Sequence, residues 1–183
     1  MSKPSDYDGR GLTEVDDRGA DFSPCRQYRY ALWRHWDWQG HANCVMFIGL
    51  NPSTADETDN DTTISKCIGF AKKWGYGGIY MLNLFAFKAT HPSEMFRAAY
   101  PIGPGNDEAL AYHRTRCGLI VAAWGAGPSK SEHGWKWLHR VEDVKRVISK
   151  PLWCLGTTKD GSPRHPSRIG YATERELFWG PQT

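Results

Sequence analysis

The chain has 183 residues, a formal net charge of +3 and 40% hydrophobic residues. This length and composition predict one globular domain and exclude a chain that is disordered throughout. No apolar run approaches the roughly 18 residues that a membrane helix needs, and no signal peptide is visible, so we expect a cytoplasmic protein. Five widely spaced cysteines favour reduced thiols over a disulfide framework.

The first part of the chain predicts an arm followed by two strands. Residues 1–24 are polar and predict a flexible N-terminal arm, which leaves residues 25–183 as a single α/β domain. Residues 28–38 alternate aromatic and polar side chains, as a strand with one buried face does. The run CVMFIGL at residues 44–50 is apolar throughout, which is typical of a strand buried on both faces.

The rest of the chain alternates helical and strand patterns. Asp61 can cap a helix whose apolar residues recur at helical spacing as far as Trp74. Further buried strands are predicted at residues 79–85, 118–124 and 152–155, and helices at residues 92–98, 106–116, 138–148 and 173–178.

This alternation predicts a three-layer α/β/α sandwich around a central, mainly parallel four-stranded sheet, with one extra N-terminal strand. In such folds, ligands bind at the carboxyl ends of the strands. Polar residues gather in the loops that follow the four buried strands, at residues 49–56, 83–93, 124–127 and 156–167. We therefore expect the functional site at this edge of the sheet.

Motifs in these loops resemble the uracil-DNA glycosylase superfamily. GLNP at residues 49–52 is similar to its first motif, especially the GINP version of the mismatch-specific branch, and HPS at residues 165–167 is similar to its second motif. The strand with Asn83 and the segment IVAAWG at 120–125 resemble, in order and rough spacing, two strands of the thermostable branch. The string GLNPSTAD at 49–56 also resembles an uncharacterised bacterial and phage family within or near this superfamily.

The resemblance implies a uracil-DNA-glycosylase-like fold and three catalytic residues. Asn51 would position the attacking water, although an amide is a weaker base than a carboxylate. Asp56 would supply that missing carboxylate, and its alternative role is capping or turn formation in an acidic loop. His165 would donate to the leaving base or stabilise its anion, and its alternative is an ordinary surface histidine.

The resemblance also implies a set of substrate contacts. Asn83 would recognise the base edge, because a side-chain amide offers a donor and an acceptor together; its alternative is a satisfied polar group at a strand end. Aromatic residues make up 13% of the chain, and the two nearest to strand ends, Phe85 and Trp124, are the candidates for stacking on a base beside Gly125. Phosphate contacts would come from Ser53, Lys159, Arg164 and Ser167.

We therefore expect a protein that binds a nucleobase and hydrolyses the N-glycosidic bond of a damaged or modified base in DNA, with base flipping as in DNA repair. The cluster-binding cysteines of the thermostable branch are absent, so neither a cofactor nor a metal is expected. An enzyme acting on a free nucleotide or modified nucleoside, and a non-catalytic nucleic-acid binder, stay open as alternatives. The expected partner is DNA or a nucleotide, with no membrane and no obligate protein partner.

Overall fold

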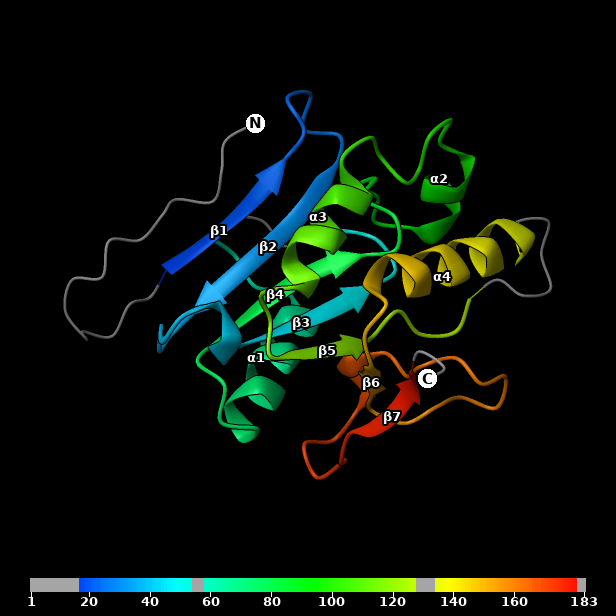
Figure 1. The fold of residues 1–183 in the computed structure, drawn as a ribbon. Coiled ribbons are helices and arrows are strands. Elements are labelled where there is room, and N and C mark those ends of the chain that lie inside the picture. Colours follow the sequence, from blue (N-terminus) through cyan, green and yellow to red (C-terminus); the bar gives the residue numbers. More distant parts are fainter. Residues whose placement is uncertain (1–16, 54–57, 128–133, 181–183) are drawn as a thin grey trace.

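The computed structural model describes residues 17–53, 58–127 and 134–180 (Figure 1). Within these ranges, a seven-stranded sheet has the spatial order β1-β2-β4-β3-β5-β6-β7. The strands are β1 (Asp17–Phe22), β2 (Arg29–His35), β3 (Cys44–Gly49), β4 (Gly78–Asn83), β5 (Leu119–Ala122), β6 (Leu152–Cys154) and β7 (Glu176–Trp179). The helices are α1 (Thr62–Lys73), α2 (Pro92–Arg97), α3 (Asn106–Arg114) and α4 (Gly134–Ile148).

The middle of the sheet is parallel. β3 pairs in parallel with β4 on one side and with β5 on the other, and β5 pairs in parallel with β6. Every residue of β3, β4 and β5 is buried, because helices cover both faces of the sheet there. This explains why these segments are continuous apolar runs in the sequence.

The expected uracil-DNA-glycosylase-like sandwich around a four-stranded, mainly parallel sheet is wrong. The sheet is mixed and has seven strands, because the pairs β1–β2, β2–β4 and β6–β7 are antiparallel. The helix expected at residues 173–178 is also wrong, since residues 176–179 form the edge strand β7. A four-residue element is shorter than the window over which helical and strand periodicity can be told apart.

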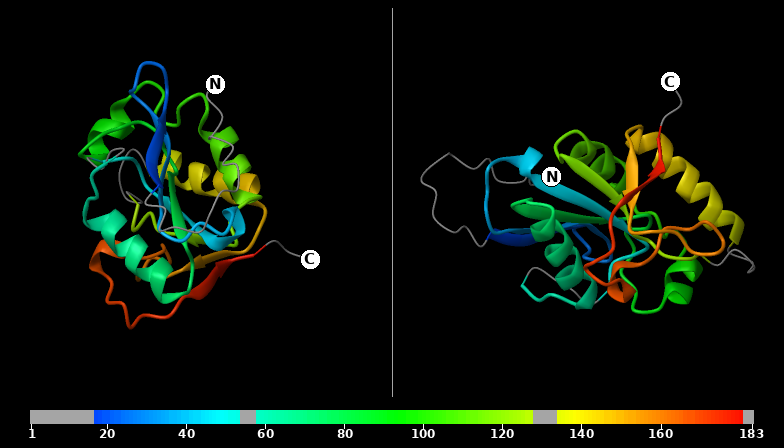
Figure 2. Two further views of the ribbon diagram at one scale, coloured as in Figure 1. Left: turned by 90° about the vertical axis from the view of Figure 1, so that its left-hand side faces the viewer. Right: turned by 90° about the horizontal axis from the view of Figure 1, so that it is seen from below.

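Helices lie on both faces of the sheet (Figure 2), and each face has its own core. On one face, Ile64, Cys67 and Phe70 of α1 pack against Val45 and Phe47 of β3. On the other face, α3 and α4 contribute Leu110, Val141 and Val144, which pack with Met46 and Ile48 of the same strand. Alternate residues of β3 therefore serve opposite cores.

The N-terminal segment differs from the expected arm within the described residues. Residues 17–22 form strand β1, which pairs antiparallel with β2 along its whole length, and residues 1–16 lie outside the described ranges. The sequence of β1, DRGADF, has little apolar character because an edge strand is held by its backbone hydrogen bonds to one neighbour.

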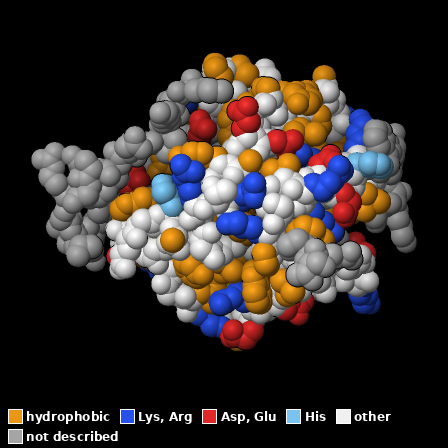
Figure 3. Space-filling view, viewed as in Figure 1, with side chains coloured by type: hydrophobic (Ala, Val, Ile, Leu, Met, Phe, Trp, Pro, Cys, Tyr) orange, Lys and Arg blue, Asp and Glu red, His pale blue; other side chains and the backbone are white. Residues whose placement is uncertain are grey.

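The surface around α3 and α4 carries charges of both signs. In the space-filling view (Figure 3), Lys and Arg side chains are interspersed with Asp and Glu side chains on this face.

The exposed hydrophobic side chains of the described residues include Leu177 on β7, which is 58% exposed. None of the helices in the described ranges is long and apolar enough to cross a bilayer.

Candidate functional site

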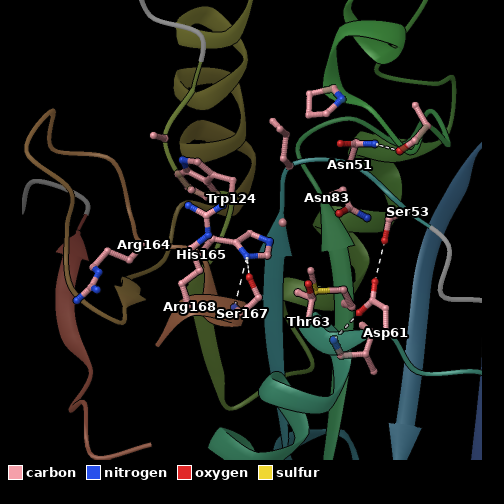
Figure 4. A pocket seen from close by; sticks show the side chains of 18 of the residues that line it. Asn51, Ser53, Asp61, Thr63, Asn83, Trp124, Arg164, His165, Ser167 and Arg168 are labelled. Carbon is pink, nitrogen blue, oxygen red and sulfur yellow. Dashed lines mark hydrogen bonds between the residues drawn. The ribbon is translucent and has the colours of Figure 1, made fainter. Parts of the chain in front are cut away.

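A pocket of about 710 Å³ lies at the carboxyl ends of the parallel strands, beside the start of α1 (Figure 4). Its walls come from the loops after β3, β4, β5 and β6, together with the first residue of β2. It thus occupies the edge of the sheet where the sequence predicted the site. The expected site residues that line it are Asn51, Ser53, Asn83, Trp124, Gly125, Arg164, His165 and Ser167.

Three expected site residues are not placed in this pocket. Asp56 lies outside the described residues. Lys159 is exposed on the loop after β6 and does not line the cavity. Phe85 is buried against Phe96 of α2, with 5.5 Å between ring centroids. Leu84 and Phe85 both belong to the core on the α3 and α4 face, so the strand alternation that would put Phe85 beside Asn83 ends after Asn83.

The amide of Asn83 is the most unusual group in the pocket. Its side chain is at the last position of β4, the residue is only 1% exposed, and neither Nδ2 nor Oδ1 has a hydrogen-bond partner among the described residues. Burying an amide without partners costs free energy, so native proteins rarely leave one unsatisfied. The arrangement is therefore typical of a group that bonds to a ligand.

The helices α3 and α4 hold the backbone at the end of β4. Asn106, at the start of α3, donates from Nδ2 to the carbonyl oxygens of Asn83 and Leu84, both at 3.1 Å. Arg140 of α4 donates from Nε to the Leu84 carbonyl at 2.6 Å, and its Nη2 lies 2.7 Å from the carboxylate of Asp107. These contacts fix the direction in which Asn83 leaves the strand.

Asn51 has a divided role. Its Nδ2 donates to the carbonyl oxygens of Pro52 at 3.0 Å and of Ala89 at 2.8 Å. These bonds leave Oδ1, on the opposite side of the amide, as an acceptor without a partner among the described residues (Figure 4). An amide oxygen held in this way can accept a hydrogen bond from a water or from a ligand hydroxyl.

His165 presents a hydrogen-bond donor to the pocket. Its Nδ1 accepts from the backbone N–H of Ser167 at 3.4 Å and lies 2.8 Å from the Ser167 hydroxyl oxygen. The neutral ring therefore carries its proton on Nε2, which faces the side of the pocket where Asn83 lies (Figure 4). Burial lowers the pKa of His165, the Asp61 carboxylate opposes this, and the positive charge of Arg168 adds to the lowering.

Gly125 makes room for this histidine. Its φ is +76°, and a Cβ at this position would lie 3.3 Å from the Cβ of His165. Both the backbone conformation and the close approach therefore favour glycine.

Asp61 is a pocket carboxylate whose role sequence reasoning described only as a helix cap. It does cap α1, accepting from the backbone N–H of Ile64 at 2.8 Å, and its second oxygen accepts from the Ser53 hydroxyl at 2.7 Å. The β3–α1 connection brings the start of this helix to the carboxyl ends of the strands. The cap pattern was the available signal, and it gave no indication that the carboxylate also lines a cavity.

Two arginines of the pocket were also missed. Arg29 is 3% exposed and enters because β2 is antiparallel to β4, so the first residue of β2 lies at the carboxyl end of β4. Arg168 extends its guanidinium toward the His165 ring, whereas the guanidinium of Arg164 points away from it (Figure 4). Nothing local in the sequence distinguishes these two cations from the other arginines of the chain.

The fold and this pocket define a mixed α/β protein with a candidate ligand site at the carboxyl ends of its parallel strands. The chain belongs to the DUF1643 family, which is described as a protein of unknown function and whose model matches residues 29–167. No curated protein and no solved structure matches the chain.

Proposed function

We propose that the pocket binds a nucleobase and that the protein hydrolyses the N-glycosidic bond between this base and its sugar. The main support is the buried amide of Asn83, whose donor and acceptor have no partner among the described residues and face the cavity that Asn51 and His165 also line. A side-chain amide matches a base edge because it offers both kinds of hydrogen-bonding group side by side.

The other polar groups suit the charges that develop during this reaction. When the bond between the anomeric carbon and the base nitrogen breaks, its electron pair leaves with the base and positive charge develops on the sugar. The Nε2 proton of His165 would hydrogen-bond to the base and stabilise its negative charge. The Asp61 carboxylate, in the same cavity, would stabilise the positive charge on the sugar.

Water completes the reaction. Held by the Asn51 Oδ1, it would bond through its oxygen to the anomeric carbon and lose a proton, while the departing base gains one. The products are the free base and a sugar with a hydroxyl group at the anomeric carbon. A side-chain amide is a weak base and does not readily take the proton of the water. We therefore expect slow turnover unless the Asp61 carboxylate takes this proton.

A specific observation favours an unpaired base over one in a duplex. Inserting into a duplex requires a protruding side chain, and the segment after HPS offers Ile169 and Tyr171. Ile169 is 3% exposed in the α1-side core, and Tyr171, although 44% exposed, is held by its ring against Phe70, with centroids 5.0 Å apart. We therefore propose that the substrate base lies in single-stranded DNA or in a free nucleotide.

A base-release assay tests the proposal. Oligonucleotides with uracil, mismatched or hypermodified bases, in single-stranded and duplex form, and the matching free nucleotides are incubated with the protein. Chromatography detects free base, and alkali cleavage detects the abasic site. We expect release to fall about 100-fold in Asn51→Ala and His165→Ala, because each removes a group that acts on the transition state.

Arg164→Gln serves as the control, since its guanidinium points away from the His165 ring. If no base is released from any member of the panel, hydrolysis of the glycosidic bond is excluded for those substrates and the proposal fails.

A further inference from the structure

We infer that the mouth of the pocket is a phosphate subsite, in which Arg168 binds the phosphate ester on the sugar of the same nucleotide. This inference rests on the proposed function, because it assumes that the base occupies the floor of the cavity. It specifies the substrate as a phosphorylated nucleoside, free or within a strand, instead of a free base or a nucleoside.

The polar groups of the pocket are ordered by depth. Asn83 is at the buried floor, Asn51, Asp61 and His165 are half-buried above it, and Arg168 is exposed at the mouth. A ligand that fills this space with its base on Asn83 would place its sugar between the half-buried groups. The phosphate attached to that sugar would then reach the level of Arg168.

The charge at the mouth fits an anion. Arg168 has neither a hydrogen-bond nor an ion-pair partner for its guanidinium among the residues that the structure describes. It lies close enough to His165 for its positive charge to lower the pKa of that ring. Asp61, the carboxylate among the described lining residues, already accepts from Ser53 and from the Ile64 N–H. A phosphate would therefore meet an available cation with five donors arranged for bidentate contact.

Arg164 provides a matched comparison within the same loop. It also lines the cavity, but its guanidinium points away from the His165 ring toward β7 (Figure 4). The two arginines have the same charge and are both exposed, so they contribute equally to a general attraction for anions. Of these two arginines, Arg168 is the one oriented to contact a group on a nucleotide that occupies the pocket.

Binding measurements on the full chain test this inference. Isothermal titration compares nucleosides, their 5′-monophosphates and single-stranded pentanucleotides that carry the bases of the release panel. For wild type we expect at least one phosphorylated ligand to bind about tenfold more tightly than its nucleoside, as one charge-assisted contact provides. Arg168→Gln should remove this advantage and Arg164→Gln should keep it, with both variants unfolding at the wild-type temperature.

The outcomes separate this inference from the proposed function. If neither the monophosphates nor the pentanucleotides bind to wild type more tightly than the matching nucleosides, or if the advantage survives in Arg168→Gln, the phosphate subsite is overturned while base binding stands. An advantage confined to the pentanucleotides assigns the phosphate to a nucleic-acid strand, and one shared by the monophosphates assigns it to a free nucleotide; both support the subsite. If no ligand binds and no base is released, both proposals fail.

Discussion

Gly49 lies directly beside Asn83 in the parallel pairing of β3 with β4, and a Cβ at Gly49 would be 2.8 Å from the Asn83 Oδ1. The glycine therefore makes space for the amide on the pocket floor. The same Cβ would lie 2.6 Å from the terminal methyl of Met81, which is a flexible group and can move more easily.

The first prediction concerns this contact. Gly49→Ala should lower the free energy of unfolding by about 1–3 kcal/mol through overpacking and weaken ligand binding, because the Asn83 amide must shift. Urea unfolding measures the change in stability, and isothermal titration with ligand measures the change in binding. Gly170→Ala is the control, since no atom lies within 4 Å of its added methyl. The double variant Gly49→Ala/Asn83→Ala should be more stable than the sum of the two single losses of unfolding free energy predicts. If it is not, the Gly49–Asn83 contact does not cause the destabilisation in Gly49→Ala.

The second prediction concerns the bonds that hold the end of β4 from the far face. Arg140→Met should destabilise the protein by about 1–3 kcal/mol, since the Leu84 carbonyl loses a buried donor and Asp107 loses its cation. It should also weaken discrimination among bases more than it changes turnover, because Asn83 loses its fixed direction. Arg146→Met breaks the exposed pair with Asp143 and should cost less than about 1 kcal/mol. Equal losses in the two variants would contradict a special role for Arg140.

The third prediction concerns the protonation of His165. Burial holds its pKa below the ordinary value and Arg168 lowers it further, so the ring is neutral at pH 7. Base release should therefore be constant near neutral pH and rise as the pH drops through this lowered pKa, because the protonated ring keeps its Nε2 proton and its added positive charge stabilises the departing base further. Arg168→Gln should raise the pKa of His165, which NMR of the imidazole protons measures, and should move the rise to higher pH. Arg164→Gln should change neither the pKa of His165 nor the pH dependence of base release. An unchanged His165 pKa in Arg168→Gln would refute the interaction between the Arg168 charge and the His165 ring.

The fourth prediction concerns stability at the opposite end of the sheet. His113 is buried against Tyr80, with ring centroids 4.4 Å apart, and burial lowers its pKa to about 3. The unfolded chain takes up a proton at His113 below about pH 6.5, whereas the folded chain does not until about pH 3. The free energy of unfolding should therefore fall as the pH drops through this window, by at most about 1.4 kcal/mol per pH unit from this residue.

Urea unfolding at several pH values measures this dependence. His113→Phe should make it shallower while keeping a ring against Tyr80. A slope that is the same in His113→Phe and wild type would show that another group causes the acid sensitivity.

Local sequence patterns determined the four parallel strands, the cap of α1 and the edge of the sheet where the pocket lies. These features depend on neighbouring residues alone: a strand covered on both faces must be apolar throughout, and Asp61 bonds to an N–H three residues away. Asn51, Asn83 and His165 meet in one cavity because Asn83 ends a parallel strand and the other two lie in loops that follow parallel strands, and these strands end at the same edge.

Only the tertiary structure decided the antiparallel edges and the full set of pocket residues. β1 and β7 are held by backbone pairing, which leaves little trace in side-chain periodicity. Arg29 reaches the pocket through the antiparallel pairing of β2 with β4, and Arg168 through the direction its side chain takes from the loop. Phe85 turns into the core because the strand alternation ends at Asn83. All of these depend on contacts between segments far apart in the chain, so no local pattern records them.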